Sequence, residues 1–166
     1  MPARRHDDLA GHPAVGLSGD RALLKGVVRN VEKTCDERLP DAATHISDVE
    51  AAGRGAFLEQ LKKLKCQLLH PAEGLNEVAR ATFTSLRGPN GEWAISDALA
   101  GIHCAALERA DFDVLAAKQA SMIWSPRSNL LLCGETAKIE EARAANLTIG
   151  IGSDWSPTAA RTCSAS

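Results

Sequence analysis

Two histidines and an aspartate stand at three separate points of the chain, each directly after a short apolar segment. They are His70, His103 and Asp154. Imidazole nitrogens and a carboxylate are the ligands that a catalytic zinc or iron ion takes, with one position left for water. Such an ion lowers the pKa of that water to about 7. Glu73, three residues after His70, is placed to move protons in the same cavity, so these residue types indicate metal-assisted hydrolysis.

Each of these residues also has a purely structural explanation. A single histidine at a strand end is more often a hydrogen-bonded structural residue than a metal ligand. Asp154 could cap a following helix, and Glu73 could interact with a helix dipole. Their common position, after separate apolar segments, is what favours chemistry over these alternatives.

The elements that would position these residues follow from the hydrophobic pattern. After an irregular lead-in over residues 1–26, short apolar segments alternate with longer amphipathic ones. The strand pattern falls at 26–32, 66–69, the end of 95–102, 120–124 and 147–152. The helix pattern falls at 46–52, 55–64, 73–86, the start of 95–102, 111–118 and 135–145. This alternation predicts β/α units around a parallel sheet, an α/β fold, with residues 27–166 as one domain.

Polar side chains follow four of the predicted strands. They are His70, His103, the segment 125–129 and Asp154. In a (β/α) barrel, catalytic groups project from the carboxyl ends of successive strands. The sequence therefore predicts a partial TIM-type barrel that carries these groups on one rim.

Four motifs lie in this order along the chain: Leu69-His70-Pro71-Ala72-Glu73-Gly74, Gly101-Ile102-His103, Trp124-Ser125-Pro126-Arg127-Ser128-Asn129-Leu130 and Gly152-Ser153-Asp154-Trp155-Ser156-Pro157. Together they resemble the signatures of strands 5, 6, 7 and 8 of the amidohydrolase superfamily. The similarity is greatest to its branch of chlorohydrolases, guanine deaminases and cytosine deaminase-like proteins. Residues 28–32 resemble a strand 4 segment of related sequences. The resemblance, over residues 26–160, implies strands 4–8 of a (β/α)8 barrel.

The resemblance also implies a role for each matching residue. His70 corresponds to a metal ligand, and His103 to a residue that binds the metal or polarises the substrate. Asp154 corresponds to a metal ligand that is also the general base, and Glu73 to the acid/base group that protonates the leaving nitrogen. The implied cofactor is a divalent metal, zinc first and iron second. The implied reaction is hydrolysis or hydrolytic deamination at a C–N or C–Cl bond of a small, cyclic substrate.

A loop with the pattern S-P-x-S-N follows the strand predicted at 120–124. By the same resemblance, its polar groups line the substrate pocket. The residues concerned are Asn129, Ser128 and Ser125.

One family feature is missing from this sequence. Members of the superfamily carry an H-x-H pair after strand 1, and both of its histidines bind the metal. None of the five histidines here is separated from another by a single residue. The resemblance therefore implies weaker metal binding, with activity only if another chain supplies strand 1. A catalytically inactive truncated remnant and a non-enzymatic α/β interaction module are the alternatives.

A barrel without its early strands also has two open sheet edges, which predicts self-association. Other partners follow from composition. The net charge of −2 lacks the basic excess of nucleic-acid-binding proteins, and no apolar segment approaches the roughly 20 residues of a membrane span. The expected partner is a small-molecule substrate, with neither nucleic acid nor a membrane.

The five cysteines are widely spread and form no C-x-x-C pair. An odd number without such spacing predicts reduced thiols in a cytoplasmic protein rather than a disulfide framework or a zinc knuckle. Cys104, which follows His103, is expected to be a small buried residue and not a nucleophile.

Overall fold

The structure is a computed structural model that describes residues 8–9, 29–30, 42–44 and 48–154. Most of the lead-in predicted over residues 1–26 lies outside these ranges. So do the histidines at positions 6, 12 and 45, and the cysteines at positions 35 and 163. The predicted metal-ligand and substrate-binding residues are all described.

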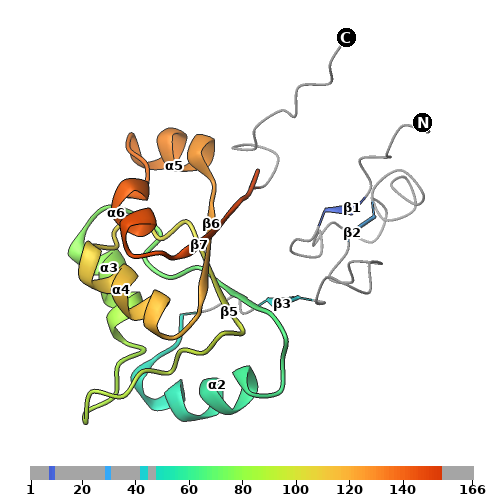
Figure 1. Ribbon diagram of the computed structural model, residues 1–166, viewed down its shortest axis with the longest axis vertical. Coiled ribbons are helices and arrows are strands. Elements are labelled where there is room, and N and C mark those ends of the chain that lie inside the picture. Colours follow the sequence, from blue (N-terminus) through green and yellow to red (C-terminus); the bar gives the residue numbers. More distant parts are fainter. Residues whose placement is uncertain (1–7, 10–28, 31–41, 45–47, 155–166) are drawn as a thin grey trace.

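A five-stranded parallel sheet forms the centre of the described molecule, with its strands in chain order (Figure 1). The strands are β3 (Ala43–Thr44), β4 (Gln67–Leu69), β5 (Leu99–Ile102), β6 (Ser121–Trp124) and β7 (Thr148–Ile151). Every neighbouring pair is parallel. Chain-order parallel strands require a crossover after each strand, so the sheet is built from successive β/α units, as predicted.

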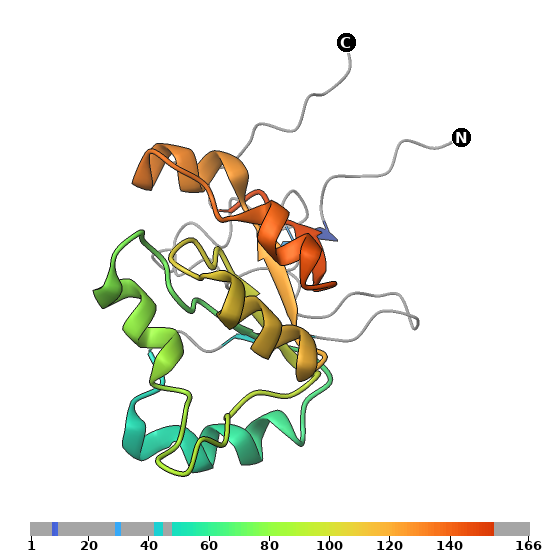
Figure 2. The same cartoon turned by 60° about the vertical axis from the view of Figure 1, so that its left-hand side comes forward.

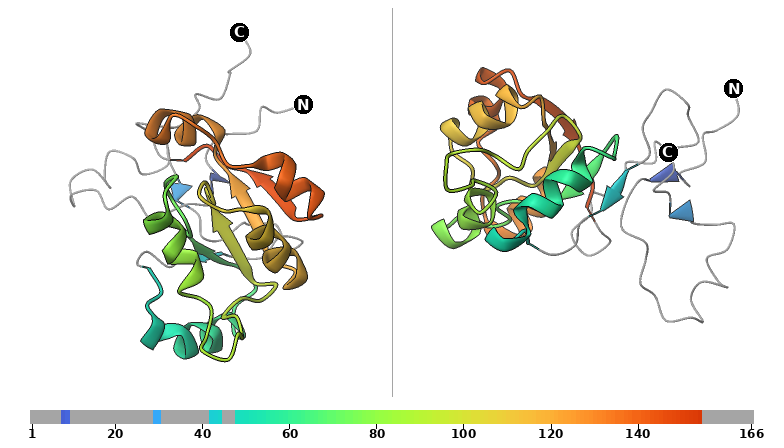
Figure 3. Two further views of the ribbon diagram at one scale, coloured as in Figure 1. Left: turned by 90° about the vertical axis from the view of Figure 1, so that its left-hand side faces the viewer. Right: turned by 90° about the horizontal axis from the view of Figure 1, so that it is seen from below.

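The connections carry the helices. They are η1 (Ala51–Gly53), α2 (Arg54–Leu61), α3 (Glu77–Thr84), α4 (Arg109–Ala117), α5 (Pro126–Cys133) and α6 (Ile139–Ala144). Helices α3, α4 and α6 lie on one side of the sheet (Figure 3). Helix α5 lies at the end where the strands finish, and α2 lies at the opposite end (Figure 2). The α/β class and the partial-barrel arrangement are thus confirmed.

The strand next to β4 is not the one expected from the sequence. Residues 28–32 resemble a strand 4 segment, but the described part of that segment, β2 (Arg29–Asn30), pairs in parallel with β1 (Asp8–Leu9) in a separate two-stranded sheet. The place beside β4 belongs to β3. Propensity alone cannot distinguish the two segments, because strand order depends on pairing between distant residues.

Several helix predictions were also inaccurate. Residues 48–50 are irregular, and only the short 3₁₀ turn η1 follows them, so the helix predicted over 46–52 is wrong in its described part. No helix precedes β5 within 95–102. Helix α6 begins at Ile139 rather than at 135. Turn-forming residues such as Gly134 end one helix before the next can begin.

Helix α3 begins later than the sequence pattern suggests. Its periodicity over 73–86 predicts that Leu75 and Val78 face the core, yet their side chains are 42% and 78% exposed. Asn76 caps the helix by accepting a hydrogen bond from the backbone N–H of Ala79 at 2.9 Å. This cap leaves Glu73 in a loop rather than in the helix.

The core lies between the sheet and the helices on its covered side. Its largest fully buried apolar side chains come from α2, α3, α4, the strands and the turns next to these helices: Leu61, Phe83, Leu86, Leu99, Leu107, Phe112, Leu115 and Met122. Because this packing fixes the strands, it also fixes the loops at their carboxyl ends. No helix in the described ranges is long and apolar enough to cross a bilayer.

Candidate metal centre

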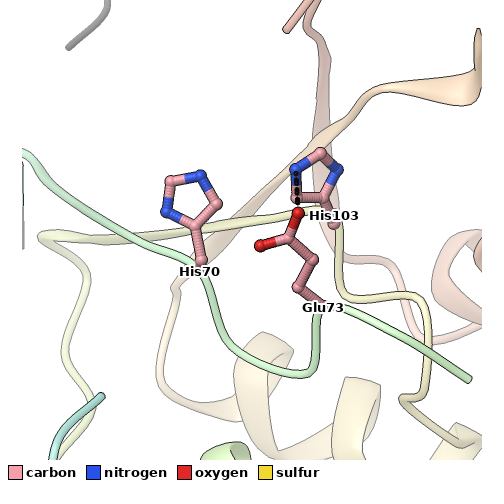
Figure 4. Close-up of side chains that lie close together, drawn as sticks. All are labelled: His70, Glu73 and His103. Atoms are coloured by element: carbon pink, nitrogen blue, oxygen red, sulfur yellow. Dashed lines mark ion pairs between the residues drawn. The ribbon is translucent and has the colours of Figure 1, made fainter. Parts of the chain in front are cut away.

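Three potential metal-ligating side chains converge beyond the carboxyl ends of β4 and β5. The group consists of His70, Glu73 and His103, whose ligand atoms all lie within 4.8 Å of one another. Figure 4 shows the Glu73 carboxylate rising between the two imidazole rings. The ring centroids of His70 and His103 are 5.5 Å apart. Parallel strands bring these groups together because all of their carboxyl ends meet at one edge of the sheet.

The loop that carries His70 and Glu73 is shaped by its backbone. Ala72 and Gly74 have positive φ angles of 59° and 127°, which turn the chain sharply on either side of Glu73. The backbone N–H of Ala72 donates to the hydroxyl of Thr82 in α3 at 2.8 Å. The loop is therefore anchored to the helix that follows it.

A glycine in the neighbouring strand makes room for this loop. A Cβ atom at Gly101 would lie 3.1 Å from Cγ of Pro71 and 2.8 Å from Sγ of Cys104. Both distances are shorter than ordinary van der Waals contact, so a larger residue would displace the loop. Since Pro71 follows His70 directly, Gly101 helps to set the position of that imidazole.

His103 is the most enclosed member of the group, with 3% of its side chain exposed. Its backbone has a φ angle of 64°, and its N–H donates to the carbonyl of Ile123 in β6 at 3.0 Å. Left-handed backbone at a residue other than glycine is uncommon and is found frequently at functional sites. On the ring, Nδ1 lies 2.9 Å from Oδ1 of Asn129, and Nε2 lies 3.5 Å from Oε1 of Glu73.

Asp154 approaches the same ring from the end of β7. Its Oδ2 lies 3.8 Å from Nε2 of His103 and accepts a hydrogen bond from the hydroxyl of Ser128. The φ angle of Asp154 is 61°, in the left-handed region that residues other than glycine rarely adopt. Sixteen per cent of its side chain is exposed. Asp154 therefore lies beside His103, next to the group of three but not within it.

The segment Ser125–Asn129 is not the loop that the sequence suggests. It forms the start of helix α5, with Ser125 at the N-cap position and Pro126 in the first turn. A proline at this position fits helix initiation, because its fixed φ is helical and its missing N–H is not needed there. All three predicted substrate-binding residues, Ser125, Ser128 and Asn129, are at most 2% exposed. Two of them bond to the site residues, Ser128 to Asp154 and Asn129 to His103.

The spacing of the donor atoms fits a metal ion. Two ligand atoms 2.0–2.2 Å from one tetrahedral zinc are about 3.4 Å apart. Nε2 of His103 and Oε1 of Glu73 are separated by 3.5 Å, close to this value, and Oδ2 of Asp154 is only slightly farther from Nε2. The carboxylate oxygens of Glu73 and Asp154 near Nε2 of His103, with the His70 ring beside His103, also favour a cation there. The residues present therefore fit a divalent metal.

The cysteine next to this group does not take part in it. Cys104 is fully buried, and burial raises the pKa of its thiol to about 12. A thiol that stays protonated at neutral pH is a poor nucleophile. The expectation of a small buried residue at this position is confirmed.

Two features of the site were missed in the sequence. One is that Glu73, expected in the same cavity as an acid/base group, lies only 3.5 Å from Nε2 of His103, as two ligands of one metal ion would. The other is that Ser128 and Asn129 contact Asp154 and His103 rather than a loop pocket. The proline after a strand was a usable signal for helix α5. The approach of Glu73 to His103 had no local signal, because it depends on how β4 and β5 pair.

Comparison with solved structures gives matches to the fold of this chain. A triazine hydrolase variant matches with a TM-score of 0.57 and 18% identity, over 81% of this chain and 28% of that chain. An adenosine deaminase from Xanthomonas campestris, solved with bound zinc, matches with a TM-score of 0.52 and 22% identity, over 66% of this chain and 26% of that chain. A triazine hydrolase from Arthobacter aurescens matches with a TM-score of 0.52 and 17% identity, over 80% and 28% of the two chains.

No protein-family model matches the sequence, and no curated protein matches it significantly. The chain spans about a quarter of the length of the solved structures that it matches. These structures are TIM-barrel amidohydrolases, and identities of this size establish a shared fold. The chain therefore has the fold of part of an amidohydrolase-type TIM barrel.

Proposed function

We propose that this chain contributes a divalent-metal site to the hydrolysis or hydrolytic deamination of a small, cyclic substrate at a C–N or C–Cl bond. The observation that carries this proposal is the convergence of His70, Glu73 and His103 at the carboxyl ends of neighbouring parallel strands. The shared fold is consistent with this chemistry, but the evidence for it is the arrangement of the site residues.

His70, His103 and Asp154 are the proposed metal ligands, and Glu73 lies close enough to join them. Zinc fits this donor set, and iron fits it as well, because imidazole and carboxylate suit both. A bound divalent metal would lower the pKa of a water molecule and polarise the substrate. The zinc of the Xanthomonas adenosine deaminase supports zinc as the first metal to test.

The remaining steps belong to the side chains. Asp154 would accept a proton from water, and its bond from the Ser128 hydroxyl holds the carboxylate in place. Glu73 would carry a proton to the leaving nitrogen. Nearly half of its side chain, 47%, is exposed, so it can exchange protons with solvent. His103 would act as a metal ligand, because Nδ1 contacts Asn129 and Nε2 is the ring nitrogen that faces the site.

The matched region spans only about a quarter of the length of these solved structures. Substrate turnover is therefore proposed only for an assembly in which further strands, with two more histidine ligands, complete the site. The substrates named for the matching structures, adenosine and triazines, are the first compounds to assay with such an assembly.

Zinc binding to the purified full chain is the direct test. Titration calorimetry and metal analysis are expected to show about one zinc per chain. His70→Ala and Glu73→Gln should each weaken zinc binding at least tenfold. Glu77→Gln is the matched control, because Glu77 is 88% exposed and lies outside the group. Absence of zinc binding by the wild-type chain, or equal binding by His70→Ala, would contradict the proposed metal site.

A further inference from the structure

The contact with Asn129 defines the hydrogen-bonding role of one ring nitrogen of His103, Nδ1. Nδ1 lies 2.9 Å from Oδ1 of Asn129, and an amide oxygen accepts hydrogen bonds but cannot donate them. The hydrogen in this contact therefore belongs to Nδ1. In the neutral ring the other nitrogen, Nε2, then carries a lone pair and no hydrogen.

The bare nitrogen faces the metal site. Nε2 lies 3.5 Å from Oε1 of Glu73 and 3.8 Å from Oδ2 of Asp154. Three acceptors facing one another repel unless a cation lies between them. With a hydrogen on Nε2, the ring would instead donate toward Glu73 and lose its lone pair as a ligand. The Nδ1–H tautomer of His103 is thus the one that leaves Nε2 ready to bind a metal.

Asn129 is well placed to control that tautomer. It is 2% exposed, and its backbone N–H donates to the carbonyl of Ser125 in the first turn of α5 at 3.0 Å. Its Nδ2 is buried and has no hydrogen-bond partner among the described residues. The contact with His103 is therefore the polar contact that orients the amide.

We propose that Asn129 is a positioning residue: it holds His103 in the Nδ1–H tautomer and so directs the Nε2 lone pair to the metal site. This inference rests on the proposed function, because the tautomer matters only if the site binds a metal. It assigns to Asn129 a role other than substrate binding. Outer hydrogen bonds of this kind orient histidine ligands and raise their basicity.

The tautomer can be measured without a metal or a substrate. The full metal-free chain, with ¹⁵N-labelled histidine, is examined by long-range ¹H–¹⁵N NMR about two pH units above the ordinary histidine pKa of about 6.5. The His103 signals are identified by their loss in His103→Gln. The expected spectrum shows a protonated Nδ1 and an unprotonated Nε2. A wild-type spectrum with the hydrogen on Nε2 would overturn the proposal, because the Asn129 amide N–H would then donate to Nδ1.

Two substitutions separate positioning from packing. Asn129→Leu keeps the approximate shape but removes the acceptor, so the Nε2–H form should increase. Asn129→Asp keeps an acceptor oxygen, so it should retain the Nδ1–H form. Ser128→Ala is the neighbouring control: it removes the bond to Asp154 and should leave the His103 tautomer as in the wild type. An unchanged tautomer in folded Asn129→Leu would contradict the proposal, and if that variant fails to fold, the wild-type tautomer decides.

Zinc affinity provides a second readout. Asn129→Leu is expected to weaken zinc binding 10- to 100-fold, and Asn129→Asp to restore it substantially. If the wild type shows the Nδ1–H tautomer but binds no zinc, the proposed function fails and the assignment of the tautomer stands. If the wild type binds zinc, but its metal-free form carries the hydrogen on Nε2, the proposed metal site stands and the proposed role of Asn129 fails.

Discussion

Arg80 in α3 donates two hydrogen bonds to the Asp111 carboxylate in α4, from Nε at 2.7 Å and from Nη2 at 3.2 Å. The carboxylate, whose side chain is only 7% exposed, also accepts a hydrogen bond from the backbone N–H of Glu108 at the start of α4. This contact ties together the helices that follow the two histidine-bearing loops. The hydrogen bonds to the Asp111 carboxylate raise the pKa of the Arg80 guanidinium, so this side chain remains positively charged.

Asp111→Asn should destabilise the fold, because it removes the charge from a nearly buried, two-point ion pair and weakens a helix cap. Hydrogen bonds to charged groups contribute about 1.5–3 kcal/mol, so the free energy of unfolding should fall by about that amount. Urea unfolding followed by circular dichroism measures it. Asp113→Asn is the control on the same helix: its pair with Arg109 is half exposed, and the loss should be under about 1 kcal/mol. Equal losses in the two variants would show that the Arg80–Asp111 contact has no special weight.

Gly101→Ala should destabilise the chain and disturb the site. The added methyl group would lie 2.8 Å from Sγ of Cys104 and 3.1 Å from Cγ of Pro71, and such overpacking costs about 1–3 kcal/mol. Displacement of Pro71 should also weaken zinc binding through His70. Gly55→Ala in α2 is the opposite control, since nothing lies within 4 Å of its added Cβ. It should raise stability by about 0.5–1 kcal/mol, and a Gly101→Ala variant of unchanged stability would contradict the close packing.

Asp154→Asn should abolish turnover in any assembly that has activity while leaving the fold largely intact. Its amide still bonds to the Ser128 hydroxyl but accepts a proton from water very poorly, and loss of a general base costs about 10²–10⁴-fold in rate. Ammonia or chloride release measures the rate, and thermal unfolding checks the fold. A variant that keeps the full rate would exclude Asp154 as the base.

Cys104 should resist alkylation in the native chain. Its thiol is buried and its pKa is raised to about 12, so iodoacetamide at pH 8 meets almost no thiolate. Peptide mass spectrometry should find Cys133, which is partly exposed, modified well before Cys104. Fast native labelling of Cys104 would contradict its burial.

The same thiol makes stability depend on alkaline pH. The unfolded chain loses the Cys104 proton above about pH 8.5, whereas the folded chain retains it up to about pH 12. Deprotonation therefore favours the unfolded state, and the free energy of unfolding should decrease as the pH rises between these values. The slope attributable to this group approaches about 1.4 kcal/mol per pH unit. Urea unfolding of Cys104→Ala at matched pH values should show a smaller decrease than that of the wild type.

The sequence was sufficient to predict the main strands and the polar groups at their ends. Runs such as Gln67–Leu69 and Ser121–Trp124 are short, apolar and bounded by turn residues, and these are local properties of the chain. His70 and His103 directly follow β4 and β5, and Asp154 comes three residues after the end of β7. In a parallel sheet such residues meet at one edge, so their proximity followed from the fold class alone.

Helix boundaries were less predictable, because they depend on competition between caps. The Asn76 cap delays α3 and leaves Glu73 in a loop, while Pro126 begins α5 inside a segment expected to be a loop. Residues 28–32 resembled a barrel strand, but β3 occupies the position beside β4. Pairing between distant segments decides such cases, and local propensity does not encode it.

The sequence by itself determined which chemical groups the chain can bring to a rim: two imidazoles and two carboxylates after successive strands. Only the tertiary structure decided how they face one another. The 3.5 Å approach of Glu73 to His103 depends on the register of β4 against β5. The contacts of Asn129 with His103 and of Ser128 with Asp154 depend on where α5 packs. These distances join residues far apart in the chain, so they are fixed by packing and strand register rather than by any local pattern of residues.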